Sequence, residues 1–192
     1  GNITKAVFTP IAQDATRVAA LISGNVHMAY PVPVQDWKRL DDAKGVKPLA
    51  GPEARTIFLG FDQLRDELLY SNIKGKNPFK DLRVRQAFIK AINIDAIKKK
   101  VMRGASVPAG LMVAPQINGF NSALNDRPSY DPKGAKKLLA DAGYPDGFEV
   151  TMDCPNNRYV NDERICQASA SMLAKIGVKV TLLACLLYTS DA

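Results

Sequence analysis

The most constraining feature of this sequence is a run of alternating helix and strand signals in its last third. A helix is predicted at 131–142, because Asp131 followed by proline is typical of a helix start and apolar residues then recur at helical spacing. Strand patterns at 148–153 and 178–183 enclose a second predicted helix at 161–176. Two strands joined through a helix form a β-α-β unit, in which the strands are parallel.

A shorter version of the same pattern lies near the start of the chain. Strand patterns at 5–10 and 26–30 flank a predicted helix at 16–23, and a short amphipathic helix is predicted at 34–42. We therefore expect a second β-α-β unit here, separate from the later one.

Between these units lies an apolar, partly β-branched stretch at 56–63, with a glycine and a proline before it and a charged segment after it. This pattern predicts a buried strand. We interpret it as a crossover strand that leaves one α/β lobe, residues 1–55, and enters another, residues 64–184. Clefts between lobes are common small-molecule sites, so a hinge and a ligand cleft are expected at the crossover.

The segment after the crossover is predicted to be a loop at 64–77, followed by helices at 82–91 and 94–103. Asp81 stands where a cap of the first helix would be, so we expect Asp81, Arg83 and Arg85 to be structural. Residues 105–129 show no periodicity. A connection of that length is either packed down against the lobe or functional.

The composition argues against several classes of protein. The net charge is +7, but the basic residues are scattered, and Lys98, Lys99 and Lys100 form the only dense run. These lysines fall at a predicted helix end, which favours a solvated helix face over a nucleic-acid patch. No apolar run is long enough to span a bilayer. The sequence shows no leader pattern and no starting methionine, so we expect the chain to begin inside a domain.

Motifs of catalysis are also missing from the sequence. It has no nucleophile elbow, phosphate loop, dinucleotide fingerprint or metal-ligand cluster, and its single histidine is His27. Adjacent carboxylates such as Asp41 and Asp42 point in different directions and cannot share a proton across a substrate. We therefore expect no catalytic residue, no bound metal and no cofactor.

Cys154 follows the strand at 148–153, and Cys166 lies in the first turns of the next helix. The loop between them could bring the two sulfur atoms together. Two unrelated buried thiols are an equal alternative at this point.

Four motifs resemble one known family. They are N-P-F-K-D-L-R-V-R-Q-A at 77–87, Y-D-P-K-G-A-K-K-L-L-A-D-A-G-Y-P-D-G-F at 130–148, the segment 170–180, and R-V-A-A-L-I-S-G at 17–24. Together they are similar to the peptide-type (family 5) solute-binding proteins of ABC transporters. Asn25 and His27 stand where that family usually has Glu and Asp. The resemblance runs from about residue 5 to 184, and residues 185–192 depart from it, so we interpret them as a non-native tail.

The resemblance implies a two-lobed periplasmic-binding-protein (flytrap) fold, with only part of each lobe in this chain. It implies a monomeric receptor in the periplasm, or lipid-anchored at the outer cell surface. Such a receptor binds peptides, nickel complexes or other small solutes and delivers them to ABC permease subunits, with no nucleic acid involved. The alternative is an α/β enzyme or nucleic-acid module without a recognisable motif, since a fold alone does not fix function.

Open α/β sheets bind ligands at the carboxyl ends of their strands. On that basis we predict the following ligand contacts: Tyr30, Pro31, Phe61, Asp62, Gln63, Asn156, Asn157 and Arg158. The compartment that the resemblance implies also favours a disulfide between Cys154 and Cys166.

Overall fold

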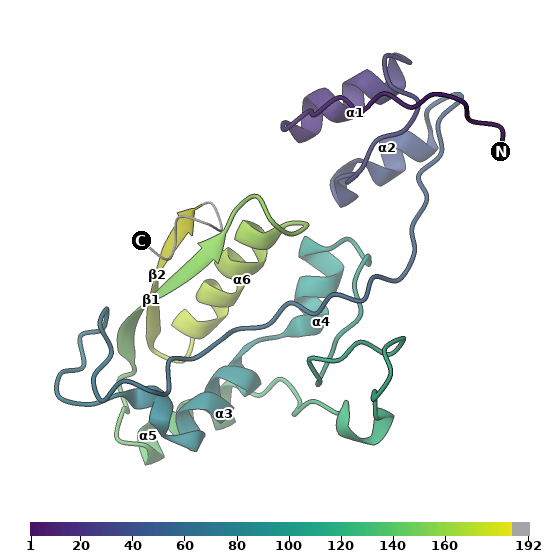
Figure 1. Cartoon of the computed structure of the whole chain (residues 1–192). Coiled ribbons are helices and arrows are strands. Elements are labelled where there is room, and N and C mark those ends of the chain that lie inside the picture. The colour runs from purple at the N-terminus through teal and green to yellow at the C-terminus, as the bar shows by residue number, and fades with distance from the viewer. Residues whose placement is uncertain (186–192) are drawn as a thin grey trace. The chain divides into compact units, whose positions relative to one another are not determined.

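The computed structural model describes residues 1–185 (Figure 1). Within it the chain divides into two compact units, one at Gly1–Gly51 and one that begins at Pro52. Each unit is a separate body with its own buried residues. The predicted tail at 185–192 lies outside the described residues except for Cys185, which is the last residue of a strand.

The first unit is built from α1 (Asp14–Ile22), a 3-10 turn (Val34–Asp36) and α2 (Trp37–Asp41). Its small core consists of Val18, Val34 and Leu40. Arg17 ties these parts together, because its guanidinium donates hydrogen bonds of 2.8 Å to the carbonyl oxygens of both Ile11 and Pro31.

The strands expected at 5–10 and 26–30 are not formed, so the prediction of a β-α-β unit in this region is wrong. The expected strand at 56–63 is likewise absent. A strand exists through hydrogen bonds to a neighbouring strand, and the described residues offer these segments none. Several of their apolar side chains stay exposed, Phe8, Met28 and Phe58 among them, whereas Leu59 and Phe61 are partly buried against the core of the second unit. An apolar run shows a tendency to be buried, but it does not supply a pairing partner.

The second unit contains the predicted β-α-β unit. Strands β1 (Phe148–Pro155) and β2 (Val178–Cys185) are parallel and in register from their first residues, and α6 (Asp162–Ala174) connects them and packs against both. The strand starts approach so closely that a Cβ atom on Gly147 would lie 2.0 Å from the carbonyl oxygen of Gly177. Only glycine fits at this point.

Helices α3 (Leu82–Ala91) and α5 (Pro132–Asp141) pack along each other beside this sheet. The order of helix and strand in the sequence predicts that α5 packs beside β1, but the main neighbour of α5 is α3. Contact with β1 comes just after the helix ends, where the Tyr144 and Phe148 rings lie 5.3 Å apart. The unit's core is shared by α3, α5, α6 and both strands, and its buried residues include Val84, Phe88, Leu139, Phe148, Leu173 and Val178.

The remaining elements of the second unit are short. They are 3-10 turns at Pro78–Lys80 and Ser122–Leu124, and α4 (Ile94–Ala96), which continues as a π-helix at Ile97–Val101. The helix predicted at 94–103 therefore ends early and changes its hydrogen-bond pattern. The predicted loop at 64–77 is irregular, but it pairs with the edge of β1 through Tyr70, whose carbonyl oxygen accepts from the Thr151 amide at 3.0 Å.

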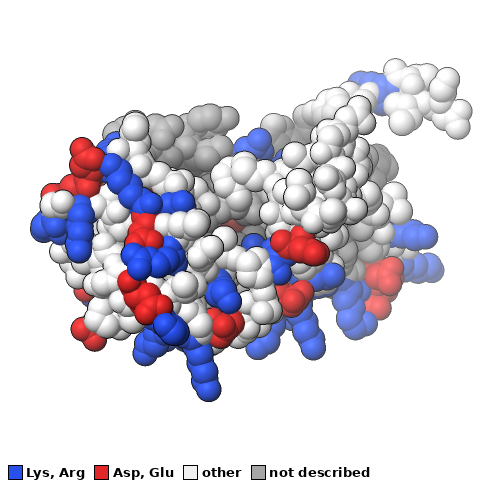
Figure 2. Space-filling view, turned by 90° about the horizontal axis from the view of Figure 1, so that it is seen from below, with Lys and Arg blue, Asp and Glu red and all other residues white. Residues whose placement is uncertain are grey.

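Charged side chains of both signs are interspersed on the face of the molecule that Figure 2 shows, which fits a solvated surface. No helix within residues 1–185 combines the length and the apolar character needed to cross a membrane.

The start of α3 gives a test of helix capping. The Asp81 carboxylate accepts a 2.8 Å hydrogen bond from the Arg83 amide and also binds the Arg83 guanidinium, whose Nη1 reaches the Asp141 carbonyl oxygen at 2.6 Å. These contacts fit the structural role expected of Asp81 and Arg83. The hydrogen bond from Arg83 is the main reason that the pKa of Asp81 is lowered.

Replacing Asp81 by Ala should lower the free energy of unfolding by about 1 kcal/mol, because the cap is lost. A lowered folded-state pKa stabilises only above the unfolded value, so the difference should shrink as the pH falls below about 4. Urea denaturation at two pH values measures both effects. The exposed Asp126, replaced by Ala, is the control, and equal midpoints for the two variants would contradict the capping role.

Candidate functional site

The loop at 155–161 connects the carboxyl end of β1 to α6. A disulfide joins Cys154, at the end of β1, to Cys166, in the second turn of α6, with 6.5 Å between their Cα atoms. The structure therefore contains the disulfide that the sequence left as one of two alternatives. The loop is held at both ends by this bond.

A buried carboxylate organises the inside of the loop. Oδ2 of Asp162 accepts hydrogen bonds of 2.9 Å from the amides of Arg158 and Tyr159, and its Oδ1 accepts one from the Glu163 amide. Asn161 has a left-handed backbone (φ 57°), which Asn tolerates better than most residues, and its side chain donates to the carbonyl oxygen of Val101 at 2.9 Å. The loop thus has a fixed path and lies against the π-helical turn.

Two guanidinium groups lie near one aromatic ring at this end of the sheet. The guanidinium carbons of Arg55 and Arg158 are each 5.3 Å from the centroid of the Tyr159 ring, a distance typical of a cation–π contact. Arg55 also forms a 2.8 Å ion pair with Glu53. The crossover therefore begins next to the carboxyl end of β1.

The far end of the crossover lies elsewhere in the unit. The half-buried ring of Phe61 packs 4.9 Å from the Phe79 ring and 5.4 Å from the Phe88 ring, and Phe79 in turn lies 6.1 Å from Phe148, the first residue of β1. Phe61 thus faces the core near the start of β1.

Asp62 forms the turn that follows. Its carboxylate accepts hydrogen bonds from the amides of Leu64 and Arg65 at 3.1 and 3.2 Å and pairs with the Arg65 guanidinium, and this pairing is the main reason that the pKa of Asp62 is lowered. Asn77, which is buried, locks the turn, because its Nδ2 donates to the carbonyl oxygens of Asp62 and Arg65 at 2.8 and 2.9 Å. Gln63 is exposed.

The predicted contacts therefore fall into separate groups. Asn156, Asn157 and Arg158 are exposed beyond the carboxyl end of β1, whereas residues 61–63 lie near its start, so the structure does not bring these two groups together. Tyr30 and Pro31 belong to the first unit. There Tyr30 is 76% exposed, and the Pro31 carbonyl oxygen is held by Arg17. For all eight predicted contact residues, a role in ligand binding stays a prediction.

Sequence reasoning missed Arg55 and Tyr159. In the sequence, Arg55 is only the last residue of the first predicted lobe, and Tyr159 lies in the loop between a predicted strand and a predicted helix. The signal that could have found Tyr159 is an aromatic residue directly after Arg158, in a loop that follows a strand end. No such local pattern marks Arg55, because the ring that it contacts, that of Tyr159, is far away in the sequence.

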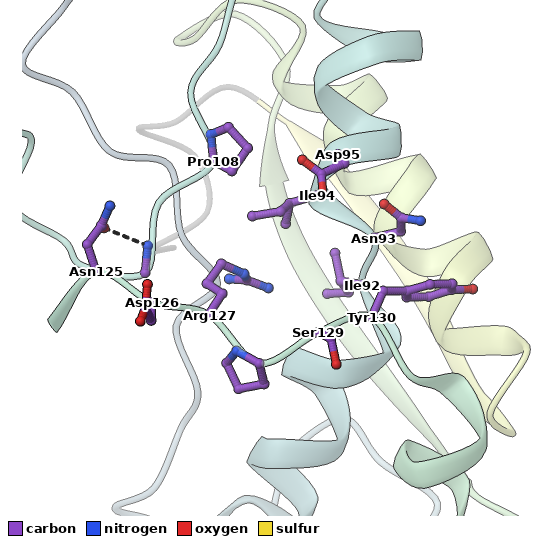
Figure 3. Close-up of a pocket in the computed structure, with 12 residues that line it drawn as sticks. Ile92, Asn93, Ile94, Asp95, Pro108, Asn125, Asp126, Arg127, Ser129 and Tyr130 are labelled. Atoms are coloured by element: carbon purple, nitrogen blue, oxygen red, sulfur yellow. Dashed lines mark hydrogen bonds between the residues drawn. The ribbon is translucent and has the colours of Figure 1, made fainter. Parts of the chain in front are cut away.

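A hollow of about 230 Å³ lies between the start of α4 and the long segment 105–129 with its continuation (Figure 3). Arg127 reaches into it and donates to the Ile89 carbonyl oxygen at 3.4 Å, and burial lowers the pKa of its guanidinium. The side chain of Asn125 accepts hydrogen bonds from the amides of Gly110 and Leu111 at 2.9 and 3.2 Å. Arg127 thus joins the end of the long segment to α3, whereas Val107 and Met112 stay exposed, so the segment is packed down against the lobe only near its end.

A metal site is not evident in this part of the chain. Within residues 1–185, no three His, Cys, Asp or Glu side chains are grouped in a way that could hold an ion.

The Asn77 lock gives a direct test of this geometry. Replacing Asn77 by Ala leaves two carbonyl oxygens and the Phe79 amide without their partner, so the free energy of unfolding should fall by roughly 2–3 kcal/mol. Asn118, which is exposed, is the matched control, and its replacement by Ala should cost about 0.5 kcal/mol or less. Denaturant titration compares the two variants. Similar small losses for both would show that the lock is not important.

Thiol counting tests the disulfide. Titration of the denatured, unreduced protein should find one free thiol, that of Cys185, and titration after reduction should find all three. Reduction should also lower the free energy of unfolding by roughly 2–3 kcal/mol, because the chain between the two cysteines is no longer closed into a loop. Three free thiols before reduction would rule the bond out.

The chain matches the family described as bacterial extracellular solute-binding proteins, family 5 Middle, over residues 1–187. It is 30% identical over 175 residues to the glutathione-binding protein GsiB of Escherichia coli K12, an alignment that covers 91% of this chain and 31% of that protein. The chain thus spans about a third of the length of the relatives that it matches.

Solved structures give the same result. The periplasmic binding protein DppA of Helicobacter pylori, in complex with the peptide STSA, superposes with a TM-score of 0.69 at 25% identity, over 94% of this chain and 32% of that one. AgaA of A. tumefaciens R10, in complex with agropinic acid, gives a TM-score of 0.67 at 30% identity, over 92% and 33%. This mixed α/β chain aligns to part of the periplasmic-binding-protein fold, and it belongs to the family 5 bacterial extracellular solute-binding proteins.

Proposed function

We propose that this chain is part of the extracytoplasmic substrate-binding subunit of an ABC importer. The subunit binds a peptide or a similar small solute between two lobes and delivers it to the permease in the membrane. The family match over residues 1–187 is the observation that carries the proposal. Solute binding, not catalysis, is the activity of this family, which agrees with the absence of catalytic motifs from the sequence.

The assignment of chain segments to the two lobes is part of the proposal. Residues 1–55 form the end of the first lobe, 56–63 the crossover and 64–184 the first half of the second lobe. The separation of the chain into two compact units near residue 51 supports this division. The periplasm, or a lipid anchor at the outer cell surface, is the location that goes with this function, and the receptor is a monomer.

The residues that we propose as solute contacts differ in whether their side chains are exposed or held by internal contacts. Tyr30 and residues 156–158 are exposed and available to a solute. Phe61 and Asp62 are held by internal contacts, with the ring in the core and the carboxylate in a turn. We therefore expect the exposed residues to contribute most of the side-chain contacts from this chain, with Pro31 and Gln63 beside them.

Calorimetry on a protein of full family length that carries this chain tests the proposal. Its probes are glutathione, the peptide Ser-Thr-Ser-Ala and agropinic acid, which are the ligands named for relatives. We expect one of these solutes to bind. Absence of binding by all three would contradict the proposed function.

Replacing Tyr30 by Ala should then weaken binding by roughly tenfold, because a large contact surface of an aromatic ring is lost. The melting temperature should not change, since this side chain is exposed. Tyr70 is also exposed and is the matched control, so its replacement by Ala should leave the affinity as it was. Equal affinities for the Tyr30 variant and the unaltered protein would remove Tyr30 from the site.

A further inference from the structure

We propose that the hollow beside Arg127 is a binding site for a small aliphatic α-amino acid, with its carboxylate on Arg127 and its ammonium group on Asp95. None of the eight predicted solute contacts lines this hollow, so the site goes beyond the proposed function and does not rest on it. Its basis is a guanidinium and a carboxylate that line one hollow without pairing with each other (Figure 3).

The guanidinium of Arg127 is half-buried but has few partners. Its hydrogen bond to the Ile89 carbonyl oxygen is long, at 3.4 Å, and is the only one that this side chain forms within residues 1–185. A guanidinium has several N–H donors, and leaving them without acceptors is costly where burial reduces contact with water. A carboxylate brought by a ligand offsets this cost, because its two oxygens match the donor edge of the guanidinium.

The carboxylate of Asp95 lies near Arg127 but does not pair with it. Burial lowers the pKa of the Arg127 guanidinium, and the negative charge of Asp95 opposes this effect, which indicates that the two groups are close. In the part of the chain that the structure describes, however, neither residue forms an ion pair. Two opposite charges that line a hollow without touching leave room for a molecule that carries both signs.

The charges around the hollow select a zwitterion over a simple ion. A simple anion would be repelled by Asp95 and by Asp126, and a simple cation would be repelled by Arg127. An α-amino acid carries a carboxylate and an ammonium group on the same carbon atom. It can therefore offer each charge of the hollow its opposite within one small molecule.

The size and the remaining lining of the hollow narrow the choice further. Its volume of about 230 Å³ lies below the range of about 300–1,000 Å³ that is usual for larger ligands, so a single amino acid fits better than a peptide. Ile92, Ile94 and two prolines, Pro108 and Pro128, contribute apolar surface. An aliphatic side chain would be the best match for these walls.

Internal hydrogen bonds hold the walls of the hollow in place. On one wall, Oδ1 of Asn93 accepts from the Ala96 amide at 2.9 Å. On the other, Oδ1 of Asn125 accepts from the Gly110 amide at 2.9 Å, and a Cβ atom on Gly110 would clash with the Asn125 carbonyl oxygen. Only glycine allows the chain to approach so closely here. Because these walls are already formed, little conformational entropy is lost when a ligand binds.

The experiment uses a protein of full family length that carries this chain, and calorimetry with L-valine and L-leucine as probes. The probe that binds more tightly is then compared with its amide, which lacks the carboxylate, and with its deaminated acid, which lacks the ammonium group. Each ligand is measured with the unaltered protein and with Arg127→Gln and Asp95→Asn. Arg164→Gln and Asp146→Asn, at exposed positions that do not line the hollow, are the controls for the loss of one charge.

We expect Arg127→Gln and Asp95→Asn each to weaken binding of the amino acid by about tenfold or more, the loss expected for a charge-assisted hydrogen bond. Arg127→Gln should not weaken binding of the amide any further, and Asp95→Asn should not weaken binding of the deaminated acid any further. The reason is that each analogue already lacks the group that the replaced residue holds. The two control variants should change the affinity by about twofold or less.

Absence of binding by both amino acids would overturn the inference. Binding that a folded Arg127→Gln or Asp95→Asn variant leaves unchanged, or weakens equally for the amino acid and the matching analogue, would overturn it too. Asp95 is exposed and Asn has nearly the same size, so this variant keeps the test decisive if Arg127→Gln does not fold. The proposed function is tested with other solutes and would stand or fall separately.

Discussion

The packing of Phe79 against its neighbours is the interaction on which the second unit depends. Its ring lies 4.9 Å from Phe61, 5.3 Å from Phe88 and 6.1 Å from Phe148, and these residues come from the crossover, α3 and the start of β1. One buried ring therefore joins segments that are distant in sequence. The Asn77 lock next to it keeps Phe79 in place, because Oδ1 of Asn77 accepts from the Phe79 amide at 2.9 Å. This cluster and the partly buried Leu59 hold the crossover against the unit.

The loop at 155–161 shows how a short irregular segment can be made rigid without a hydrophobic core. A loop usually exposes its backbone amides to water and moves. Here the Asp162 carboxylate accepts hydrogen bonds from two amides of the loop. The disulfide joins the strand before the loop to the helix after it. Both devices limit the motion of Arg158 and Tyr159 relative to β1. They therefore fix the position of this loop at the carboxyl end of β1.

The sequence predicted the part of the fold that depends on local signals. Helix α5 could be predicted because Asp131 and the proline after it mark its start, and β1, α6 and β2 because their apolar periods change at glycines. The strands expected at 5–10, 26–30 and 56–63 depended on pairing partners, which no local pattern reveals. The same limit applies to the candidate site, of which the sequence predicts only the part that follows a local signal. Asn156 to Arg158 follow a strand end that the pattern locates, whereas the approach of Arg55 to Tyr159 is set by the path of the crossover.

The residues of the family motifs and the exposed loop residues have different roles in this chain. The residues that carry the family resemblance have internal roles: Asn77 locks a turn, Asp81 and Asp131 cap helices, and Tyr144 packs in the core. None of these side chains is available to a solute, because each is already bound within the protein. Exposed positions such as Tyr30 and Arg158 lie outside the two motifs that contain these four residues. The motifs therefore mark the family, and under the proposed function we expect the choice of solute to depend on exposed loop residues instead.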